Sequence, residues 1–277
     1  MKADKKKIIS IITVVTAVIL FAVWAFFATI YLCGVKDAGG YNERVGTRFI
    51  AHRGYSGKYF QNTVQAFKAA GQSGFFQGIE TDVWSTADGV YVCCHDETPF
   101  CDKSVKVTES LYDDIKDLPL DLSSAGADVD LSLDYRICTL SEYLNVCYGY
   151  RKLAVIEIKQ KFNREEAEAL ATFARGFVSW RNLIFCSFNK NVIDYVYDAN
   201  PYVGIMLFTS DKTKATLYSA MGYNVGVAKS VPTKKFVDGR HKKGEFVNAY
   251  TVNDSEEARA LIGMGIDFIT TDVVLSV

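Results

Sequence analysis

The chain has 277 residues, with 31 Lys and Arg against 32 Asp and Glu, so its formal net charge at pH 7 is -1. That length allows one large domain or two small ones, and the balanced charge gives no field that would attract nucleic acid or another polyanion. Aromatic residues make up 13% of the chain and there are only four prolines, which argues against disorder or a long flexible linker.

The N-terminal segment is predicted to anchor the chain in a membrane. Residues 8–33 carry no charge, and at 1.5 Å per residue they exceed the ~30 Å hydrocarbon core of a bilayer. A cleaved signal peptide needs only ~7–15 apolar residues. This run is longer, and its second half holds the bulky Trp24, Phe26 and Phe27. We therefore expect an uncleaved transmembrane helix over residues 8–33.

The charges on the two sides of this apolar run predict its orientation. Residues 1–7 contain four lysines, whereas residues 34–47 mix both signs and are rich in glycine. The positive-inside rule therefore makes residues 1–7 a cytoplasmic basic tail. Residues 34–47 would be a short linker to an outward-facing domain of residues 48–277, in a single-pass protein of the cell membrane.

From residue 48 onward, short apolar runs alternate with helical patterns, which is typical of βα units. Strands are predicted at residues 48–52, 78–84, 153–158, 183–187, 203–208, 224–228, 245–250 and 267–271. Helices are predicted at residues 62–73, 140–148, 164–178, 189–200, 210–221 and 254–264. Eight strands that alternate with helices predict an α/β fold, a (β/α)₈ TIM barrel.

A ninth strand-like run, residues 90–95, follows the second strand after only a few residues that include Asp88 and Gly89. A parallel crossover needs about a dozen residues, so this connection should be a hairpin. The ninth run would then lie antiparallel at the rim of the barrel, outside the count of eight. Such a hairpin leaves His95 facing back toward Glu80 and Asp82.

Residues from about 97 to 137 show a weaker pattern, with a short helix predicted over residues 108–116 and a polar, irregular stretch after it. A loop of this length inside a compact domain is usually functional or disordered. We interpret it as an insertion over the barrel mouth.

The seven cysteines form no CxxC pair and have no zinc-binding spacing. Free buried thiols are the simplest interpretation, because free cysteine often packs as a small hydrophobic residue. A disulfide such as Cys101 with Cys138 stays open for a domain outside the cell, since the sequence does not assign pairings.

Carboxylates share a face on two of the predicted strands. Side chains two residues apart in a strand point the same way, so Glu80 and Asp82 share one face of their strand, and Glu157 and Lys159 share one face of theirs. Helices cover the outside of a barrel, so these groups should lie at its mouth, where like charges repel unless a cation or proton lies between them. Three oxygen ligands suit a hard cation such as Mg²⁺ or Ca²⁺. The alternative is a structural ion-pair cluster with Lys159 and Arg53.

Two of the three histidines belong to the same region. His52 ends the first strand at the C-terminal face, where barrel enzymes have their active sites. With His95 it offers two groups that titrate near neutrality, and a metal, a base and an acid together make a site for phosphodiester hydrolysis. His241 lies in a segment rich in Lys and Arg and is expected to be solvated.

The motifs in this order resemble the glycerophosphodiester phosphodiesterase family, a phosphatidylinositol-phospholipase-C-like TIM barrel. They are AHRG at 51–54, NTVQAFKAA at 62–70, GIETDVWSTADGVYVCCHDET at 78–98, IEIK at 156–159, SFN at 187–189, AYTVND at 249–254 and GIDFITTD at 265–272. The resemblance implies metal-dependent hydrolysis of glycerophosphodiesters to sn-glycerol 3-phosphate and an alcohol. It implies the following roles: Glu80, Asp82 and Glu157 as metal ligands, His52 and His95 as the acid–base pair, and Arg53 and Lys159 as phosphate ligands.

Two departures from the family pattern bear on metal affinity and substrate preference. The family usually has Pro-Glu-Asn-Thr before its first helix, where this chain has Phe60, Gln61, Asn62 and Thr63. Gln61 and Asn62 would lie in a second shell around the metal, with Gln61 lacking the charge of a glutamate. Tyr250 replaces a tryptophan of the family and would form an aromatic wall for the alcohol.

Three functions remain open from the sequence. The first is a membrane-anchored phosphodiesterase that acts on small glycerophosphodiesters. The second keeps the enzyme but gives it lysophospholipids or glycerophosphate polymers as substrates, in the manner of a lysophospholipase D. The third is a non-catalytic barrel that binds head groups, favoured only by Gln61 and by the Cys93-Cys94 pair before His95. The sequence does not indicate the oligomeric state.

Overall fold

The computed structural model describes residues 13–25 and 46–277. Residues 13–25 are helical, with mostly exposed side chains. Within the two described ranges, no helix combines the length and apolar character needed to cross a bilayer. The predicted transmembrane helix of residues 8–33 is described only at residues 13–25, and residues 1–7 and most of the linker lie outside the described ranges. The membrane anchor therefore stays a prediction.

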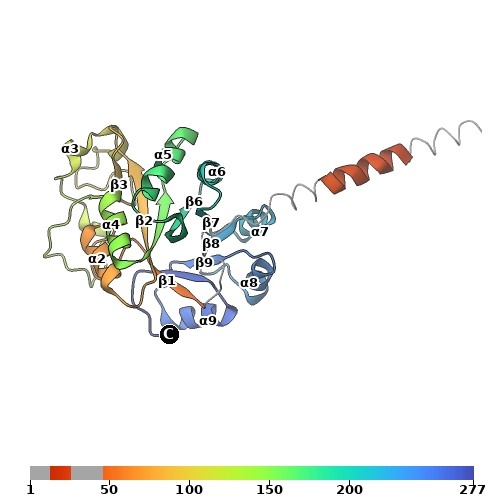
Figure 1. The fold of residues 1–277 in the computed structure, drawn as a ribbon. Helices are drawn as coiled ribbons and strands as arrows, with labels where there is room; N and C mark the ends of the chain where they lie inside the picture. Colours follow the sequence, from red (N-terminus) through yellow and green to blue (C-terminus); the bar gives the residue numbers. More distant parts are fainter. Residues whose placement is uncertain (1–12, 26–45) are drawn as a thin grey trace, which may run out of the picture.

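Eight parallel strands close into a barrel, as the sequence predicts (Figure 1). In the order of their pairing around the barrel they are β1 (Arg48–Ala51), β10 (Phe268–Thr271), β9 (Val247–Tyr250), β8 (Asn224–Ala228), β7 (Gly204–Thr209), β6 (Leu183–Ser187), β5 (Leu153–Ile158) and β2 (Gly78–Ser85). Pairing of Ile50 with Gly78 joins β1 to β2 and completes the ring. The described domain thus has the TIM-barrel fold.

Helices surround the barrel. They are α2 (Val64–Gln72), α4 (Leu140–Tyr150), α5 (Arg164–Arg175), α6 (Lys190–Ala199), α7 (Lys212–Ala220), α8 (Lys234–His241) and α9 (Ser255–Met264), with a short 3-10 helix η3 (Trp180–Asn182) before β6. Asp254 caps the N-terminus of α9, since its carboxylate accepts hydrogen bonds from the backbone N–H groups of Glu256 and Glu257.

Helix α8 was not predicted, because it is rich in Lys and Arg and buries only two apolar side chains, Phe236 and Val237. Its start is marked by Thr233, whose side chain accepts from the Phe236 N–H. The expectation that His241 is solvated is wrong: its Nε2 lies 3.0 Å from Asp267 Oδ2, and the side chain is partly buried.

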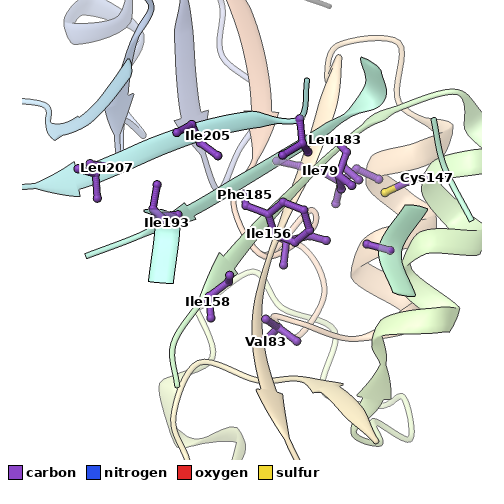
Figure 2. Packing of buried hydrophobic residues seen from close by; sticks show 14 of the residues in the cluster. Ile79, Val83, Cys147, Ile156, Ile158, Leu183, Phe185, Ile193, Ile205 and Leu207 are labelled. Carbon is purple, nitrogen blue, oxygen red and sulfur yellow. The ribbon is translucent and has the colours of Figure 1, made fainter. Parts of the chain in front are cut away.

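The alternation of side chains in the strands decides which residues reach the mouth. Ile79, Val83, Ile156 and Ile158 pack into the apolar layer between the barrel and its helices (Figure 2). The residues that alternate with these four in each strand must therefore point into the barrel. In this way the burial of two aliphatic pairs sends Glu80, Asp82 and Glu157 inward.

The predicted rim hairpin is confirmed. Strand β3 (Tyr91–Cys93) pairs antiparallel with β2, so that Cys93 lies opposite Val83, and β4 (Cys138–Thr139) pairs antiparallel with β3. The insertion between β3 and β4 contains η1 (Val107–Glu109), α3 (Tyr112–Ile115) and η2 (Leu122–Ser124). It has an apolar cluster of its own, formed by Phe60, Val92, Cys94, Phe100, Val107, Ile115, Leu120, Val129, Tyr135 and Ile137.

All six cysteines in the described ranges are free, so Cys101 and Cys138 form no disulfide.

A buried carboxyl group lies just before β9, at the end of the barrel away from His52. Glu245 is fully buried and accepts a hydrogen bond from Ser219 Oγ, while Arg240 Nε lies 3.6 Å from its Oε2. Burial raises the pKa of Glu245 to about 7, although Ser219, Arg240 and Lys243 oppose the shift. The folded state therefore keeps a proton on Glu245 between the ordinary glutamate pKa of ~4.5 and pH ~7, whereas the unfolded chain has lost it.

We expect Glu245 to make the folded state less stable as pH rises from 5 to 7.5. In this window the contribution should fall by about 1–3 kcal/mol, because ionised Glu245 is penalised by burial only in the folded state. The measurement is the free energy of unfolding of the wild type minus that of Glu245→Gln, at several pH values. This difference cancels the titration of carboxyls elsewhere in the fold. The exposed Glu256→Gln serves as the control and should show no such slope. A flat difference for Glu245→Gln would contradict the assignment.

Candidate active site

Three buried carboxylates meet at the C-terminal mouth of the barrel, on β2 and β5. Glu80 is 2% exposed, Asp82 1% and Glu157 8%, and one oxygen from each lies within 4.8 Å of the others. The register places Asp82 directly beside Glu157 in neighbouring strands. The structure therefore brings together all three residues predicted as metal ligands.

The pKa values of these carboxyls show how much the cluster needs positive charge. Burial, Asp82 and Glu157 raise the pKa of Glu80 well above its ordinary value, and burial and Asp82 raise the pKa of Glu157 to about 7. Burial alone would also raise the pKa of Asp82, but Arg53 and Lys159 hold it below its ordinary value. Three carboxylate ligands in a small buried site fit a hard divalent cation, whose charge would keep all three ionised.

Asn62 fixes the orientation of Asp82. Its side-chain amide donates to Asp82 Oδ2 at 2.9 Å, and its carbonyl oxygen accepts from Thr81 Oγ1 at 2.8 Å. Asn62 is buried and has a φ of 56°, a left-handed conformation that asparagine tolerates better than most residues. The structure thus places Asn62 behind the carboxylates, as predicted.

Two cations lie against the carboxylates. Lys159 Nζ is 3.1 Å from Glu157 Oε1 and 3.4 Å from Asp82 Oδ1, and Arg53 Nε is 3.2 Å from Asp82 Oδ2. The backbone N–H of Arg53 also donates to Glu80 Oε2 at 2.8 Å. Both side chains remain about one-fifth exposed, so their charges can also reach an anion in the mouth.

His52 has an acidic partner that the sequence analysis missed. Its Nδ1 lies 2.7 Å from Asp272 Oδ1, just after β10, the neighbour of β1 in the closed barrel. Although burial opposes it, the contact with His52 lowers the pKa of Asp272 to about 2, and Asn253 and Ser56 add hydrogen bonds. A carboxylate on Nδ1 fixes the imidazole orientation and leaves Nε2 for proton transfer. The sequence did contain a signal for this partner, since Asp272 is the last residue of the GIDFITTD motif.

His95 follows the hairpin strand and lies near Asp82. The backbone N–H of Cys94 donates to the carbonyl of Asp82 at 3.1 Å, which ties this end of the hairpin to β2. His95 Nδ1 lies 2.9 Å from Asp96 Oδ1. Burial lowers the pKa of His95 despite the nearby Asp82, which favours a neutral imidazole at neutral pH. The hairpin thus brings the second histidine to the carboxylates.

Two cavities open beside these histidines under the insertion. The larger, about 430 Å³, is lined by His52, Arg53 and Asp272 and by insertion residues 124–129. The smaller, about 160 Å³, is lined by His95, Asn62 and residues of the insertion, among them Thr98, Lys103 and Asp121. Phe60, Gln61 and Ser124 line both cavities. The insertion therefore does lie over part of the mouth, as predicted.

Gln61 lies next to Arg53, which in turn lies against Asp82. Its Oε1 accepts a hydrogen bond from Arg53 Nη1, and its Nε2 donates to Ser124 Oγ at 3.1 Å. These bonds place its amide against the arginine and the insertion, not against the carboxylates.

Tyr250 belongs to an aromatic wall on the opposite half of the mouth. Its ring stacks on Phe208 with centroids 4.9 Å apart and meets Phe188 edge-on at 6.1 Å. Phe188 is 53% exposed, so the wall continues to solvent. The Tyr250 hydroxyl is buried without a hydrogen-bond partner among the described residues, and burial and Glu157 raise its pKa, which keeps it a donor. A substrate group in the mouth could accept from it.

Comparisons with known proteins agree with this geometry. Residues 52–276 match the Glycerophosphoryl diester phosphodiesterase family. The chain is 32% identical over 240 residues to the uncharacterized protein YqiK of Bacillus subtilis. This alignment covers 82% of this chain and 95% of that protein. It is 26% identical over 238 residues to a glycerophosphodiester phosphodiesterase of Bacillus altitudinis. That alignment covers 82% of this chain and 94% of the relative.

Solved structures share the fold. An Oleispira antarctica phosphodiesterase, solved in complex with the product sn-glycerol-3-phosphate, superposes with a TM-score of 0.70 at 23% identity. The alignment covers 82% of this chain and 93% of that one.

Proposed function

The chain belongs to the glycerophosphoryl diester phosphodiesterase family, and from this premise we propose that it hydrolyses glycerophosphodiesters with a divalent cation on Glu80, Asp82 and Glu157. The chain is an enzyme of the phosphoric diester hydrolase class, so a non-catalytic barrel is set aside. One observation carries the proposal best: a buried carboxylate cluster, flanked by Arg53 and Lys159, lies at the barrel mouth where the chain also places His52, next to Arg53, and His95, near Asp82.

The proposed chemistry begins with the phosphate, for which Arg53 and Lys159 supply positive charge at the edge of the carboxylate cluster. A bound Mg²⁺ or Ca²⁺ would supply neutralisation of the phosphate and orientation of the glycerol 2-hydroxyl. One histidine removes the proton of that hydroxyl as it attacks phosphorus, and the other protonates the departing alkoxide. Water then opens the resulting cyclic phosphate to sn-glycerol 3-phosphate.

Asp272 supports this scheme through His52. The ion pair keeps the ring oriented and stabilises the imidazolium that forms when Nε2 takes a proton. His95 has a more exposed partner in Asp96, whose side chain is 74% exposed. The two histidines thus differ in how firmly their rings are held.

A second substrate class is favoured by the aromatic wall. Phe188, Phe208 and Tyr250 offer apolar surface beside the site, and Phe188 extends it toward solvent. A lysophospholipid would place its acyl part on such a wall, which a small glycerophosphodiester does not need. We therefore keep lysophospholipids as the alternative substrates, with glycerophosphate polymers as a further class.

We also propose that the enzyme acts at the outer surface of a cell membrane. The uncharged run of residues 8–33, the four lysines before it and the short linker support this location. A tether of this length would hold the barrel close to lipid head groups.

A substrate panel on membranes from cells that produce the full chain tests the function and the location together. We expect release of sn-glycerol 3-phosphate from glycerophosphocholine and glycerophosphoethanolamine, in the membrane fraction, with the activity lost when intact cells are treated with protease. Faster turnover of lysophosphatidylcholine would favour the alternative substrate. Activity in the soluble fraction alone would refute the anchor but not the chemistry, and no turnover of any diester would refute the function.

A further inference from the structure

The end of the barrel opposite the mouth carries exposed aromatic side chains. The segments that lead into the strands form this end, and its aromatic residues lie before β5, β6 and β7, three neighbouring strands of the ring: Tyr148, Tyr150, Trp180 and Tyr202. Tyr148 is 71% exposed and Tyr202 65%, and the rings of Trp180 and Tyr202 have centroids 5.7 Å apart. Exposed rings that gather on one part of a surface indicate a contact with a partner or a membrane.

The same end of the barrel is basic. The cations of the segments that lead into the strands are Arg151, Lys152, Arg181, Lys242 and Lys243. The acidic residues of these segments, Glu245 and Asp267, are both buried. Among the described residues, the exposed acids closest to these segments in the chain are Asp198 and Asp238, and each is paired with an arginine or a lysine. This end therefore presents positive charge around the aromatic rings.

The opposite end of the barrel has the opposite charge. The insertion of residues 97–137 contains ten acidic residues and four basic ones, and it lies over part of the mouth. In the field of a negatively charged bilayer, the basic end is attracted and the insertion is repelled. The net charge of the whole chain is only -1, so this separation of charge orients the domain more than it attracts it to anions in general.

The chain enters the domain at the basic end. Strand β1 starts at Arg48, and the first residue of a barrel strand lies at the end away from the mouth. The predicted membrane helix would therefore be joined to this end by residues 34–47, which as a flexible chain would span about 20 Å. The basic, aromatic end is the part of the domain that such a linker holds nearest to a bilayer.

We propose that this docking face, formed by Tyr148, Tyr150, Trp180 and Tyr202 with the surrounding cations, lies on the anionic head groups of a bilayer and turns the mouth away from the lipid. Tyr and Trp rings favour the head-group region. Each Lys or Arg near an anionic surface strengthens binding by about fivefold. The proposal rests on the proposed location for its tether, whereas lipid binding by the docking face does not require the anchor.

Docking in this orientation favours substrates that arrive from water. Strands rise ~3.3 Å per residue and tilt by ~36° in a TIM barrel, so the six residues of β5 place the mouth roughly 15 Å farther from the bilayer than the docking face. A lysophospholipid in the same leaflet would have to leave the bilayer to reach Glu80 and Asp82. Water-soluble glycerophosphodiesters and glycerophosphate polymers need no such step.

The test uses two tryptophans as reporters in the full chain, reconstituted into vesicles of phosphatidylcholine and phosphatidylglycerol. Trp180 lies on the docking face, whereas Trp84 lies near the C-terminal end of β2, at the mouth. The emission of each is the wild type minus Trp180→Phe or minus Trp84→Phe, so that the emission of Trp24 cancels. With a nitroxide on the lipid head group, we expect the emission of Trp180 to fall by about twofold or more and that of Trp84 by less than about a tenth.

Removal of charge tests the electrostatic part of the proposal. In Arg151→Gln combined with Lys242→Gln, the ratio of docked to undocked chain should fall by about fivefold for each charge removed. Arg181 stays in place, because its guanidinium lies over the ring of the Trp180 reporter at 5.0 Å. The matched control is Lys212→Gln combined with Lys214→Gln, which removes two exposed charges at the start of α7, on the mouth side. This control should leave the quenching of Trp180 unchanged.

Several results would overturn the proposal. They are equal quenching of Trp84 and Trp180, no quenching of either, and an effect of the control pair as large as that of Arg151→Gln with Lys242→Gln. Faster turnover of lysophosphatidylcholine in the chain's own vesicles than of glycerophosphocholine in solution would contradict the outward direction of the mouth. A dimer that the charge variants dissociate, without any quenching by lipid, would assign the face to a second copy of the chain.

The proposed location and function fail in ways that differ from a failure of docking. A chain that alkaline carbonate extracts from the vesicles has no anchor, yet selective quenching of Trp180 before the extraction would still support the docking face. No turnover of any diester would refute the proposed function and leave the quenching comparison decisive.

Discussion

Replacement of His52 or His95 by alanine is expected to lower turnover of glycerophosphocholine by a factor of about 10²–10⁴ for each, because each variant lacks one of the two groups that transfer protons. The double variant should lose little more turnover than the less active of the two single variants, since the two groups act in one reaction and their effects do not add. The measurement is the initial rate of sn-glycerol 3-phosphate release by the purified chain at saturating substrate.

His241→Ala is the matched control for these variants. His241 is the third histidine of the chain and contacts Asp267, at the end of the barrel away from the site. Its replacement should keep turnover within about twofold, although the lost contact will cost some stability. Turnover that survives in both His52→Ala and His95→Ala would refute acid–base catalysis by this pair.

Asp272→Asn refines the same prediction. The amide keeps the size of the aspartate but removes the charge that holds Nδ1 of His52 and stabilises its protonated form. We expect a loss of kcat of about 10–10³-fold with KM nearly unchanged, as for a group that acts on substrate only through another residue. An equal rise in KM would instead indicate that Asp272 binds substrate.

The fold and the centre of the site could be predicted because they follow from short-range patterns. The eight strands needed only the alternation of apolar runs, and the inward direction of Glu80, Asp82 and Glu157 needed only the two-residue period of a strand. The hairpin followed from a connection too short for a crossover. Each of these inferences uses residues within one or two neighbouring elements.

The contacts that escaped prediction depend on residues far apart in sequence or on an irregular segment. His52 and Asp272 are 220 residues apart and meet only because β1 pairs with β10 when the ring closes. Gln61 was placed near the metal by its position in a motif, whereas its partner Ser124 comes from the insertion, whose path has no periodic signal. Helix α8 was not predicted because most of its residues are charged or polar, so its two buried apolar residues form no helical apolar pattern in the sequence.

Removal of a divalent cation should abolish activity and also reverse the order of stability between the wild type and Glu80→Gln. Without a cation, the wild type carries three buried carboxyls, and the ionisation of two of them, Glu80 and Glu157, is opposed, as their raised pKa values indicate. Both groups bind a proton more tightly in the folded state. The stability of the metal-free wild type should therefore fall as pH rises from the ordinary glutamate value of ~4.5 through about 7.

Glu80→Gln removes one of these charges and nearly keeps the shape of the side chain. In EDTA at pH 8 we expect the variant to be more stable than the wild type by about 1–3 kcal/mol. Saturation with Mg²⁺ or Ca²⁺ should stabilise the wild type by about 3–4 kcal/mol at 100–1,000 times its dissociation constant and should hardly affect the variant. The order of stability then reverses. Thermal unfolding of both proteins, with and without the cation, gives the four values required.

The reversal separates a metal site from a structural ion-pair cluster with Lys159 and Arg53. In a purely structural cluster, loss of Glu80 would leave the two cations less compensated, so the variant would be less stable in EDTA and unaffected by added Mg²⁺ or Ca²⁺. Exposed Glu165→Gln controls for unspecific effects of the cation and should follow the wild type. Because the readout is unfolding and not turnover, the test holds for any substrate. A wild type that gains no stability from either cation would refute the metal site, even if the histidine variants behave as expected.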